Sequence, residues 1–221
     1  MKTLQTGFYA PDQITNYYPE IADIYKSAFA DPPWNEVSTC RAPGVTETAC
    51  QDGLSPLTIG DQCSACGLCP TEPAYKTDEL TAKFQDIADC KTALWYLEAD
   101  ENQLTMCALA WVGDARTVAS EKYAANSAMT PWLQATLPDE SFVWIDEVFA
   151  DRSVKPSGNL ANFANMVDGF SERLELPALA YRTITPQMLS AARRIGARVW
   201  DADSNELPDR RSFVRINRNN V

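Results

Sequence analysis

The 221-residue chain contains no histidine. This absence excludes the Ser-His-Asp and Cys-His nucleophile systems, histidine proton shuttles and every metal site with an imidazole ligand. Any side chain that exchanges a proton in a reaction must then be Asp, Glu, Tyr, Lys or Cys. A site for a soft metal ion must be built from thiolates.

The sequence also lacks a long apolar run. No stretch approaches the roughly 20 apolar residues that span a membrane, and the first residues lack the continuous apolar region of a signal peptide. We therefore expect a cytoplasmic protein with no membrane partner. As to oligomeric state, we expect a monomer or a homodimer.

Basic residues are few, and they are unevenly distributed. The net charge of −11 and the isoelectric point near 4.5 argue against nucleic acid as a partner. Residues 151–221 nevertheless hold 11 basic and 8 acidic side chains, whereas residues 1–150 hold 8 and 22. We expect an anionic ligand to bind the C-terminal part and a cationic substrate to bind the rest.

Apolar periodicity predicts a mixed α/β fold. Helices are expected over residues 18–29, from Thr77 onward, over 159–174 and over 187–195. Strands are expected over residues 4–9, 93–97, 104–112, 142–150, 178–184, 199–200 and 213–216. The chain is long enough for one sizeable core, so we expect a single domain over residues 1–221 with two insertions, the Cys-rich segment 40–73 and a helical segment 114–140.

Five of the seven cysteines fall in the first insertion, which has few large apolar residues of its own. The Cys63-Ser-Ala-Cys66-Gly-Leu-Cys69-Pro70 run has the spacing of a metal-binding knuckle, and Cys40 and Cys50 can complete a four-sulfur site. We predict structural Zn²⁺ bound by Cys40, Cys50, Cys63 and Cys66, with Cys69 as the substitute ligand. An iron–sulfur cluster and thiols that are unligated or paired in disulfides are the alternatives. Cys90 and Cys107 are predicted to be core thiols.

The expected strand 142–150 runs into a Gly-containing turn and a helix start. This arrangement directs backbone N–H groups and the positive end of the helix toward one point, which suits a phosphate group. An ordinary strand-to-helix turn is the alternative interpretation of the same residues.

The order of elements resembles the GCN5-related N-acetyltransferase (GNAT) superfamily. Lys155-Pro156-Ser157-Gly158-Asn159-Leu160 is similar to its coenzyme A signature, with Lys155 in place of Arg or Gln and Leu160 in place of a small residue. Trp34 lies in a segment similar to the "PPWNE" segment of some members. The resemblance implies a mostly antiparallel central sheet flanked by helices, and acetyl transfer from acetyl-CoA to a primary amine of a small molecule or protein.

The resemblance also implies roles for the residues around the central strand. Backbone groups of Val148, Phe149 and Ala150 would align the thioester, and amides of Lys155 and of residues 156–160 (Pro156, Ser157, Gly158, Asn159 and Leu160) would hold the pyrophosphate. Asp146 or Glu147 would take the proton from the amine. Strand alternation puts Asp146 on the face of Val148 and Glu147 on the opposite face, unless a bulge inverts it.

Three questions stay open at this level. The acids at 146 and 147 can instead pair structurally with an arginine such as Arg182. The late-helix position where many members have a tyrosine holds Ala192, so Tyr181 or water would protonate the thiolate, unless Tyr181 serves in strand packing. Asp31 and Glu36 beside Trp34 suit a cationic amine or form a solvated acidic surface.

Because of these departures, a catalytically weak GNAT-like module that binds a protein partner is the alternative to an enzyme. A small iron–sulfur redox protein is a third possibility.

Overall fold

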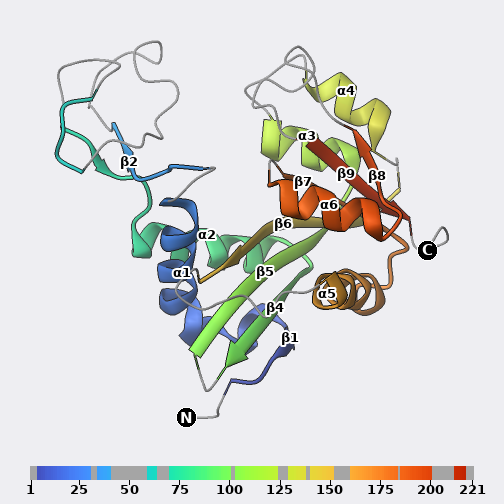
Figure 1. The fold of residues 1–221 in the computed structure, drawn as a ribbon, viewed down its shortest axis with the longest axis horizontal. Helices are drawn as coiled ribbons and strands as arrows, with labels where there is room; N and C mark the ends of the chain where they lie inside the picture. The colour runs from blue at the N-terminus through green and yellow to red at the C-terminus, as the bar shows by residue number, and fades with distance from the viewer. Residues whose placement is uncertain are drawn as a thin grey trace.

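The computed structural model describes residues 4–30, 34–40, 59–63, 70–100, 103–123, 129–137, 140–151, 160–183, 185–200 and 212–217. Within them, a seven-stranded sheet has the order β1-β4-β5-β6-β7-β9-β8 (Figure 1). All neighbouring strands of this sheet are antiparallel except β6 and β7. Its strands are β1 (Gly7–Tyr9), β4 (Ala93–Asp100), β5 (Gln103–Gly113), β6 (Phe142–Ala150), β7 (Ala178–Thr183), β8 (Arg198–Trp200) and β9 (Ser212–Asn217).

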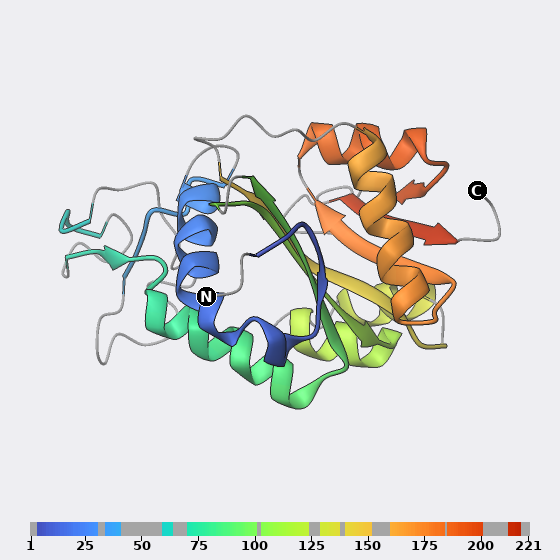
Figure 2. The ribbon, with the colours of Figure 1, turned by 90° about the horizontal axis from the view of Figure 1, so that it is seen from below.

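Helices cover both faces of the sheet. Residues of α1, α2, α3 and α4 pack in one apolar cluster, and residues of α5 and α6 pack in another on the opposite face (Figure 2). The helices are α1 (Tyr18–Ala30), α2 (Thr77–Cys90), α3 (Ala115–Tyr123), α4 (Met129–Thr136), α5 (Leu160–Arg173) and α6 (Pro186–Arg194). The mixed α/β class and the mostly antiparallel sheet predicted from the sequence are confirmed.

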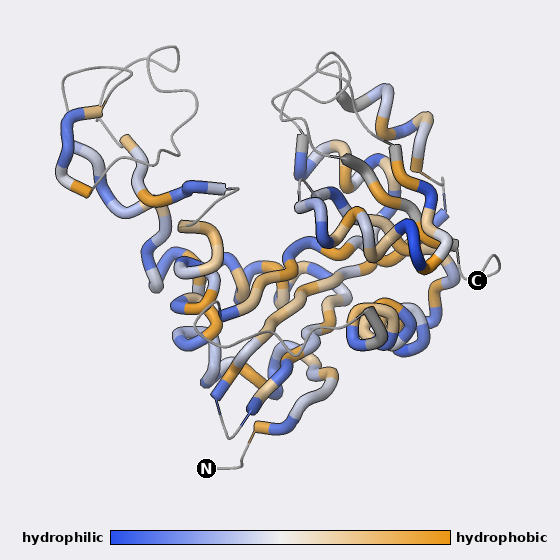
Figure 3. The backbone as a smooth tube through the Cα atoms, viewed as in Figure 1, coloured by the Kyte–Doolittle hydropathy of each residue, from blue (hydrophilic) through white to orange (hydrophobic). Residues whose placement is uncertain are grey.

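Side-chain size differs between the two faces of the central strands. On β5, Leu109 and Trp111 belong to the cluster under α1 and α2, while Ala108 and Ala110 belong to the cluster under α5. Strand alternation produces this separation because successive side chains point to opposite faces. The buried strands form a continuous apolar band through the molecule (Figure 3).

Gly169 lets α5 approach β1 closely. A Cβ atom at this position would lie 2.3 Å from Cζ of Phe8. The Phe8 ring in turn contacts Phe170 at 5.2 Å and Tyr96 at 4.9 Å between centroids. The absent side chain therefore allows aromatic packing that holds α5 against the sheet.

The predicted elements agree with the structure in type and differ at their ends. The first strand is shorter than predicted, because only Gly7–Tyr9 pairs with β4. The helical insertion consists of two helices, α3 and α4. No helix in the described part of the chain has the length and apolarity needed to cross a bilayer.

Candidate functional site

The site begins where β6 and β7 separate. The two strands pair only at Val143 with Leu179 and at Trp144 with Ala180, although β6 stays paired with β5 as far as Ala150. Beyond Trp144, β6 has no strand partner on its β7 side among the residues with described positions. This edge therefore presents backbone N–H and C=O groups that a ligand can pair with.

A β-bulge sets the direction of the acids on β6. Leu109 of β5 lies opposite Glu147, and Ala110 lies opposite Ile145, so Asp146 is an extra residue on β6. Both acids consequently contact residues on the α1, α2 and α3 side. Val148 packs on the α5 and α6 side. The prediction that Asp146 shares a face with Val148 is wrong, because one inserted residue shifts the alternation. Glu147 does lie on the face opposite to Val148, as strand alternation predicts.

Both acids line a first cavity of about 330 Å³. Its charged lining residues are Glu36, Lys83, Lys122, Asp146, Glu147 and Arg182. Its aromatic lining residues are Tyr25, Phe29, Trp34, Tyr75 and Tyr181. The cavity thus combines equal numbers of acids and bases with several aromatic side chains.

A second cavity of about 510 Å³ lies between α5 and α6. Phe163, Met166 and Ala191 contribute to its lining, together with Arg194. Val148 and Met188 line both cavities, so the two adjoin at the separation of β6 and β7. A long ligand in the second cavity can therefore present its end to a molecule in the first.

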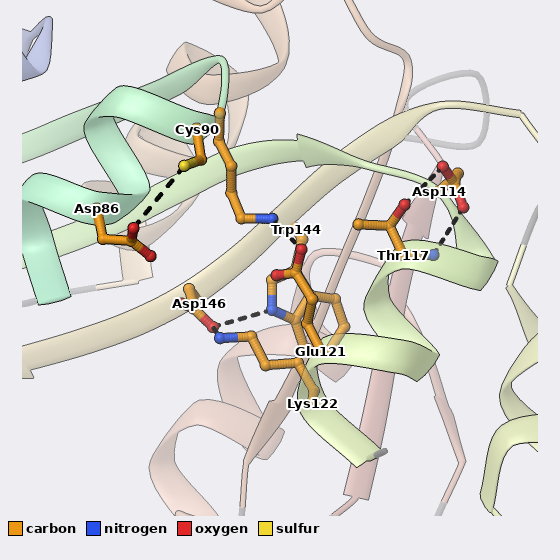
Figure 4. A network of polar contacts seen from close by, with 9 residues as sticks. Asp86, Cys90, Asp114, Thr117, Glu121, Lys122, Trp144 and Asp146 are labelled. Atoms are coloured by element: carbon orange, nitrogen blue, oxygen red, sulfur yellow. Dashed lines mark hydrogen bonds and ion pairs between the residues drawn. The ribbon is translucent and has the colours of Figure 1, made fainter.

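Asp146 is held by two donors on one oxygen. Its Oδ1 forms an ion pair with Nζ of Lys122 and accepts a hydrogen bond from Nε1 of Trp144 at 3.2 Å (Figure 4). The side chain is 4% exposed, and its Oδ2 is buried with no hydrogen-bond partner among the described residues. Burial alone would raise the pKa of the carboxyl, but the charges of Lys122 and Lys83 and the two hydrogen bonds lower it below its usual value.

Glu147 lies against α1 and α2. Its Oε1 accepts hydrogen bonds from Oη of Tyr25 at 3.2 Å and from Nζ of Lys83 at 2.9 Å. The Glu147 side chain is 15% exposed. Desolvation would lower the pKa of Lys83, but the charge of Glu147 outweighs it and raises that pKa, so Lys83 is an ammonium ion. The acids at 146 and 147 thus have lysine partners that the sequence analysis did not identify.

Tyr181 and Ala192 are the two residues that the sequence analysis considered for protonation of a thiolate. Oη of Tyr181 is buried without a partner among the described residues, and the side chain lines the first cavity. Burial raises the pKa of this phenol. Ala192 is fully buried in α6, so the helix presents no acid at that position.

The predicted coenzyme-binding residues are described in part. Val148, Phe149 and Ala150 form the end of β6, and Leu160 is the first residue of α5. Lys155, Pro156, Ser157, Gly158 and Asn159 lie outside the described residues.

The cysteine prediction is also described in part. Cys50, Cys66 and Cys69 lie outside the described residues, and no group of three potential metal ligands occurs among those inside them. Cys40 directly follows β2 (Ser38–Thr39), and Cys63 is buried. Cys107 is buried as predicted, but Cys90 is exposed because it ends α2 on its solvent side.

Sequence reasoning missed Tyr25, Tyr75, Lys83 and Lys122 as site residues. Each lies on a helix or connecting segment remote in sequence from β6, and no motif links them to it. The helical periodicity that placed Tyr25 on an apolar face was the only signal.

Comparisons with known proteins agree with this geometry at the level of the fold. No protein-family model and no curated protein sequence matches the chain. The fold is similar to that of YncA, a putative acetyltransferase from Salmonella typhimurium solved with its cofactor acetyl-CoA, with a TM-score of 0.50, 10% identity, and coverage of 97% of this chain and 95% of that one. It is also similar to the C-terminal condensation domain of Ebony in complex with β-alanyl-dopamine, with a TM-score of 0.51, 11% identity, and coverage of 91% and 93%. At these identities the likeness establishes the fold alone.

The Lys122–Asp146 pair yields a stability prediction. Lys122→Met leaves a buried carboxylate without its ion partner, and we expect a loss of about 3–5 kcal/mol in the free energy of unfolding at pH 7. Adding Asp146→Asn removes the unpaired charge and restores much of this loss. Urea denaturation of the three proteins measures both effects.

The matched control is Lys76→Met, because Lys76 pairs with Glu72 on the exposed surface and its loss should cost less than about 1 kcal/mol. The folded-state pKa of Asp146 is lowered, so its stabilisation is present above the usual carboxyl pKa and is lost as the pH falls through the lowered value. The deficit of Lys122→Met must therefore shrink on acidification. A deficit that does not depend on pH contradicts the assignment.

Proposed function

We propose that the chain is an N-acetyltransferase that transfers the acetyl group of acetyl-CoA to a primary amine. The observation that carries the proposal is the junction of two cavities at Val148 and Met188, between separated strands. One cavity suits the coenzyme arm and the other suits the acceptor. The likeness of the fold to acetyltransferase structures supports the same conclusion.

The second cavity fits the arm of coenzyme A. Phe163, Met166 and Ala191 supply apolar surface between α5 and α6. The open edge of β6 offers amide partners to the amides of the pantetheine arm. Residues 155–159 precede the 14-residue helix α5 in the sequence, and a helix N-terminus is a favourable position for the pyrophosphate.

Acetyl transfer then proceeds by direct attack. The amine nitrogen attacks the thioester carbonyl carbon, a C–N bond forms, the C–S bond breaks, and the thiolate leaves with the bonding electrons. Backbone groups of Val148, Phe149 and Ala150 orient the carbonyl at the junction. The enzyme acts mainly by positioning the reactants and stabilising the developing charge.

The two carboxylates have different surroundings and take different roles. Glu147 takes the proton of the attacking ammonium, since its carboxylate lies at the cavity surface. Asp146 orients the amine, since both of its donors bind Oδ1 and Oδ2 is left to accept an N–H from the acceptor. The ion pair with Lys122 makes Asp146 a weak proton acceptor.

Tyr181 is the candidate acid for the thiolate. Its side chain lines the first cavity, and burial raises the pKa of the phenol, so the proton is present at neutral pH. Transfer of that proton to the departing sulfur completes the reaction, and the tyrosinate is reprotonated from solvent.

Binding of acetyl-CoA tests the coenzyme assignment. A saturating ligand raises the melting temperature of the native protein, so acetyl-CoA should stabilise the wild type. Ala191→Trp fills the second cavity and should abolish the shift. Gln85→Trp on the exposed surface of α2 is the control and should retain it. No shift for the wild type at millimolar acetyl-CoA would contradict the proposal and favour the non-catalytic binding module.

Substitution of the acids tests their roles. Glu147→Gln should lower kcat by about a hundredfold or more, the usual effect of losing a general base, with the Kd for acetyl-CoA unchanged. Asp146→Asn should act mainly on the KM for the amine. Steady-state kinetics with a simple amine separates the effects. If Asp146→Asn lowers kcat and Glu147→Gln does not, the roles are reversed.

We further propose that the insertion binds structural Zn²⁺ through four of Cys40, Cys50, Cys63, Cys66 and Cys69. Residues 70–73 lie between two segments that carry cysteines. Residues 72 and 73 pair with β2, which lies directly before Cys40. Residues 70 and 71 pair with residues 60–62, which lie directly before Cys63. This arrangement brings two of the five cysteines to neighbouring segments, which supports one shared site.

Metal analysis tests the zinc proposal. The purified protein should contain about one equivalent of zinc, and Cys63→Ser should lose it together with stability, because metal binding contributes to folding. Cys90→Ser, at an exposed thiol, is the control and should retain the metal. A metal-free wild type purified without chelator rules the site out, and visible absorbance with bound iron supports the iron–sulfur alternative.

A further inference from the structure

One wall of the first cavity is made of aromatic rings from α1 and the segments that follow it. Tyr25 stacks on Phe29 with centroids 4.4 Å apart and meets Tyr75 edge to face at 5.1 Å. Trp34 lies 5.2 Å from Phe29. Aromatic surfaces of this kind attract cations through the negative faces of the rings.

A carboxylate lies at each end of the tyrosine pair. Oη of Tyr25 donates to Oε1 of Glu147 at 3.2 Å, and Oη of Tyr75 donates to Oε2 of Glu36. The backbone N–H of Glu36 donates to the carbonyl of Phe29 at 2.8 Å, which fixes the position of Glu36 at the end of α1. Glu147 precedes Val148 at the junction with the second cavity, whereas Glu36 is separated from Glu147 by the two tyrosine hydroxyls.

Burial and the neighbouring carboxylates raise the pKa of both tyrosines in this wall. Burial, followed by the charges of Glu147 and Glu36, raises the pKa of Tyr25. The pKa of Tyr75 is raised by burial and by its hydrogen bond to Glu36. Both phenols donate hydrogen bonds to carboxylates, and both side chains line the cavity.

The chain itself supplies an example of such a group. Nζ of Lys83 lies 5.3 Å from the centre of the Tyr25 ring and 2.9 Å from Oε1 of Glu147. An alkylammonium ion is therefore held here by one carboxylate and one ring face. The other end of the wall, at Glu36 and Trp34, offers the same pair of chemical groups.

Asp146 provides an independent indication of a ligand. Its side chain is 96% buried and lines the cavity, yet Oδ2 has no hydrogen-bond donor among the residues whose positions are described. A buried carboxylate oxygen without a donor is costly, and an N–H of a bound amine would satisfy it.

We infer that the acceptor is an aliphatic amine that carries a second cationic group. The reacting nitrogen lies between Asp146 and Glu147 beside Val148, and the second cation lies against Glu36, Trp34 and Tyr75. This substrate class rests on the proposed acetyl transfer, but the binding of the dication is a separate property of the cavity. The cations of the lining are compatible with it, since Lys83 and Lys122 are each paired with an acid and Arg182 also has an interaction partner.

The experiment compares three acceptors of similar length: 1,4-diaminobutane, butylamine and 5-aminopentanoate. Acetyl transfer is followed by loss of thioester absorbance, and binding to the CoA-saturated protein is measured by calorimetry. We expect kcat/KM and affinity for the diamine to exceed those for butylamine by about tenfold, the effect of one charge-assisted contact. The carboxylate-bearing amine should be the weakest of the three.

Glu36→Gln should lower kcat/KM for the diamine by more than it lowers kcat/KM for butylamine, so that the preference for the diamine is lost. Glu79→Gln, on the exposed side of α2, is the matched control and should retain the preference. Equal use of diamine and butylamine, or a uniform effect of Glu36→Gln on all three amines, overturns the inference. If the diamine binds in a Glu36-dependent way but acetyl-CoA does not bind, the inference is supported and acetyl transfer is contradicted. If acetyl-CoA binds but the diamine does not, acetyl transfer is supported and the inference is contradicted.

Discussion

The pairing of β6 with β7 at two residue pairs is the constraint on which the site depends. A sheet that stayed paired along the full length of both strands would close the edge of β6 and remove the junction between the two cavities. On either side of the opening, β6 pairs extensively with β5 and β7 pairs extensively with β9, in both cases antiparallel. The sheet therefore holds together although β6 and β7, the parallel neighbours among the described strands, separate. The cost of unpaired strand edges is then offset when a ligand with amide groups binds there.

Each of the two acids beside this opening is paired with a lysine, which compensates its charge. The bulge at Asp146 turns two consecutive carboxylates toward the same layer of helices, where each acquires a lysine from a different helix. Lys83 comes from α2, and Lys122 comes from α3 of the second insertion. The helices that cover this face therefore also set the protonation states in the cavity. Their packing links the stability of the fold to the chemistry of the site.

Much of the fold was predictable, because local patterns determine it. The apolar stripe of α1, the Thr77 start of α2 and the largely apolar β6 are properties of neighbouring residues. The acids of the site were also identified from their place on β6. The direction of Asp146 was not, because a bulge depends on the register with β5 and leaves no signature in β6 itself. The lysine and tyrosine partners were missed because only the tertiary packing of α1, α2 and α3 brings them to β6.

The central claim is that two ligands meet at Val148 and Met188. A crystal structure of the chain with coenzyme A tests it most directly. The account predicts the pantetheine arm between α5 and α6, paired with the open edge of β6, and the sulfur atom at the junction of the two cavities. Coenzyme A bound elsewhere, or a sulfur atom remote from Val148, would contradict it.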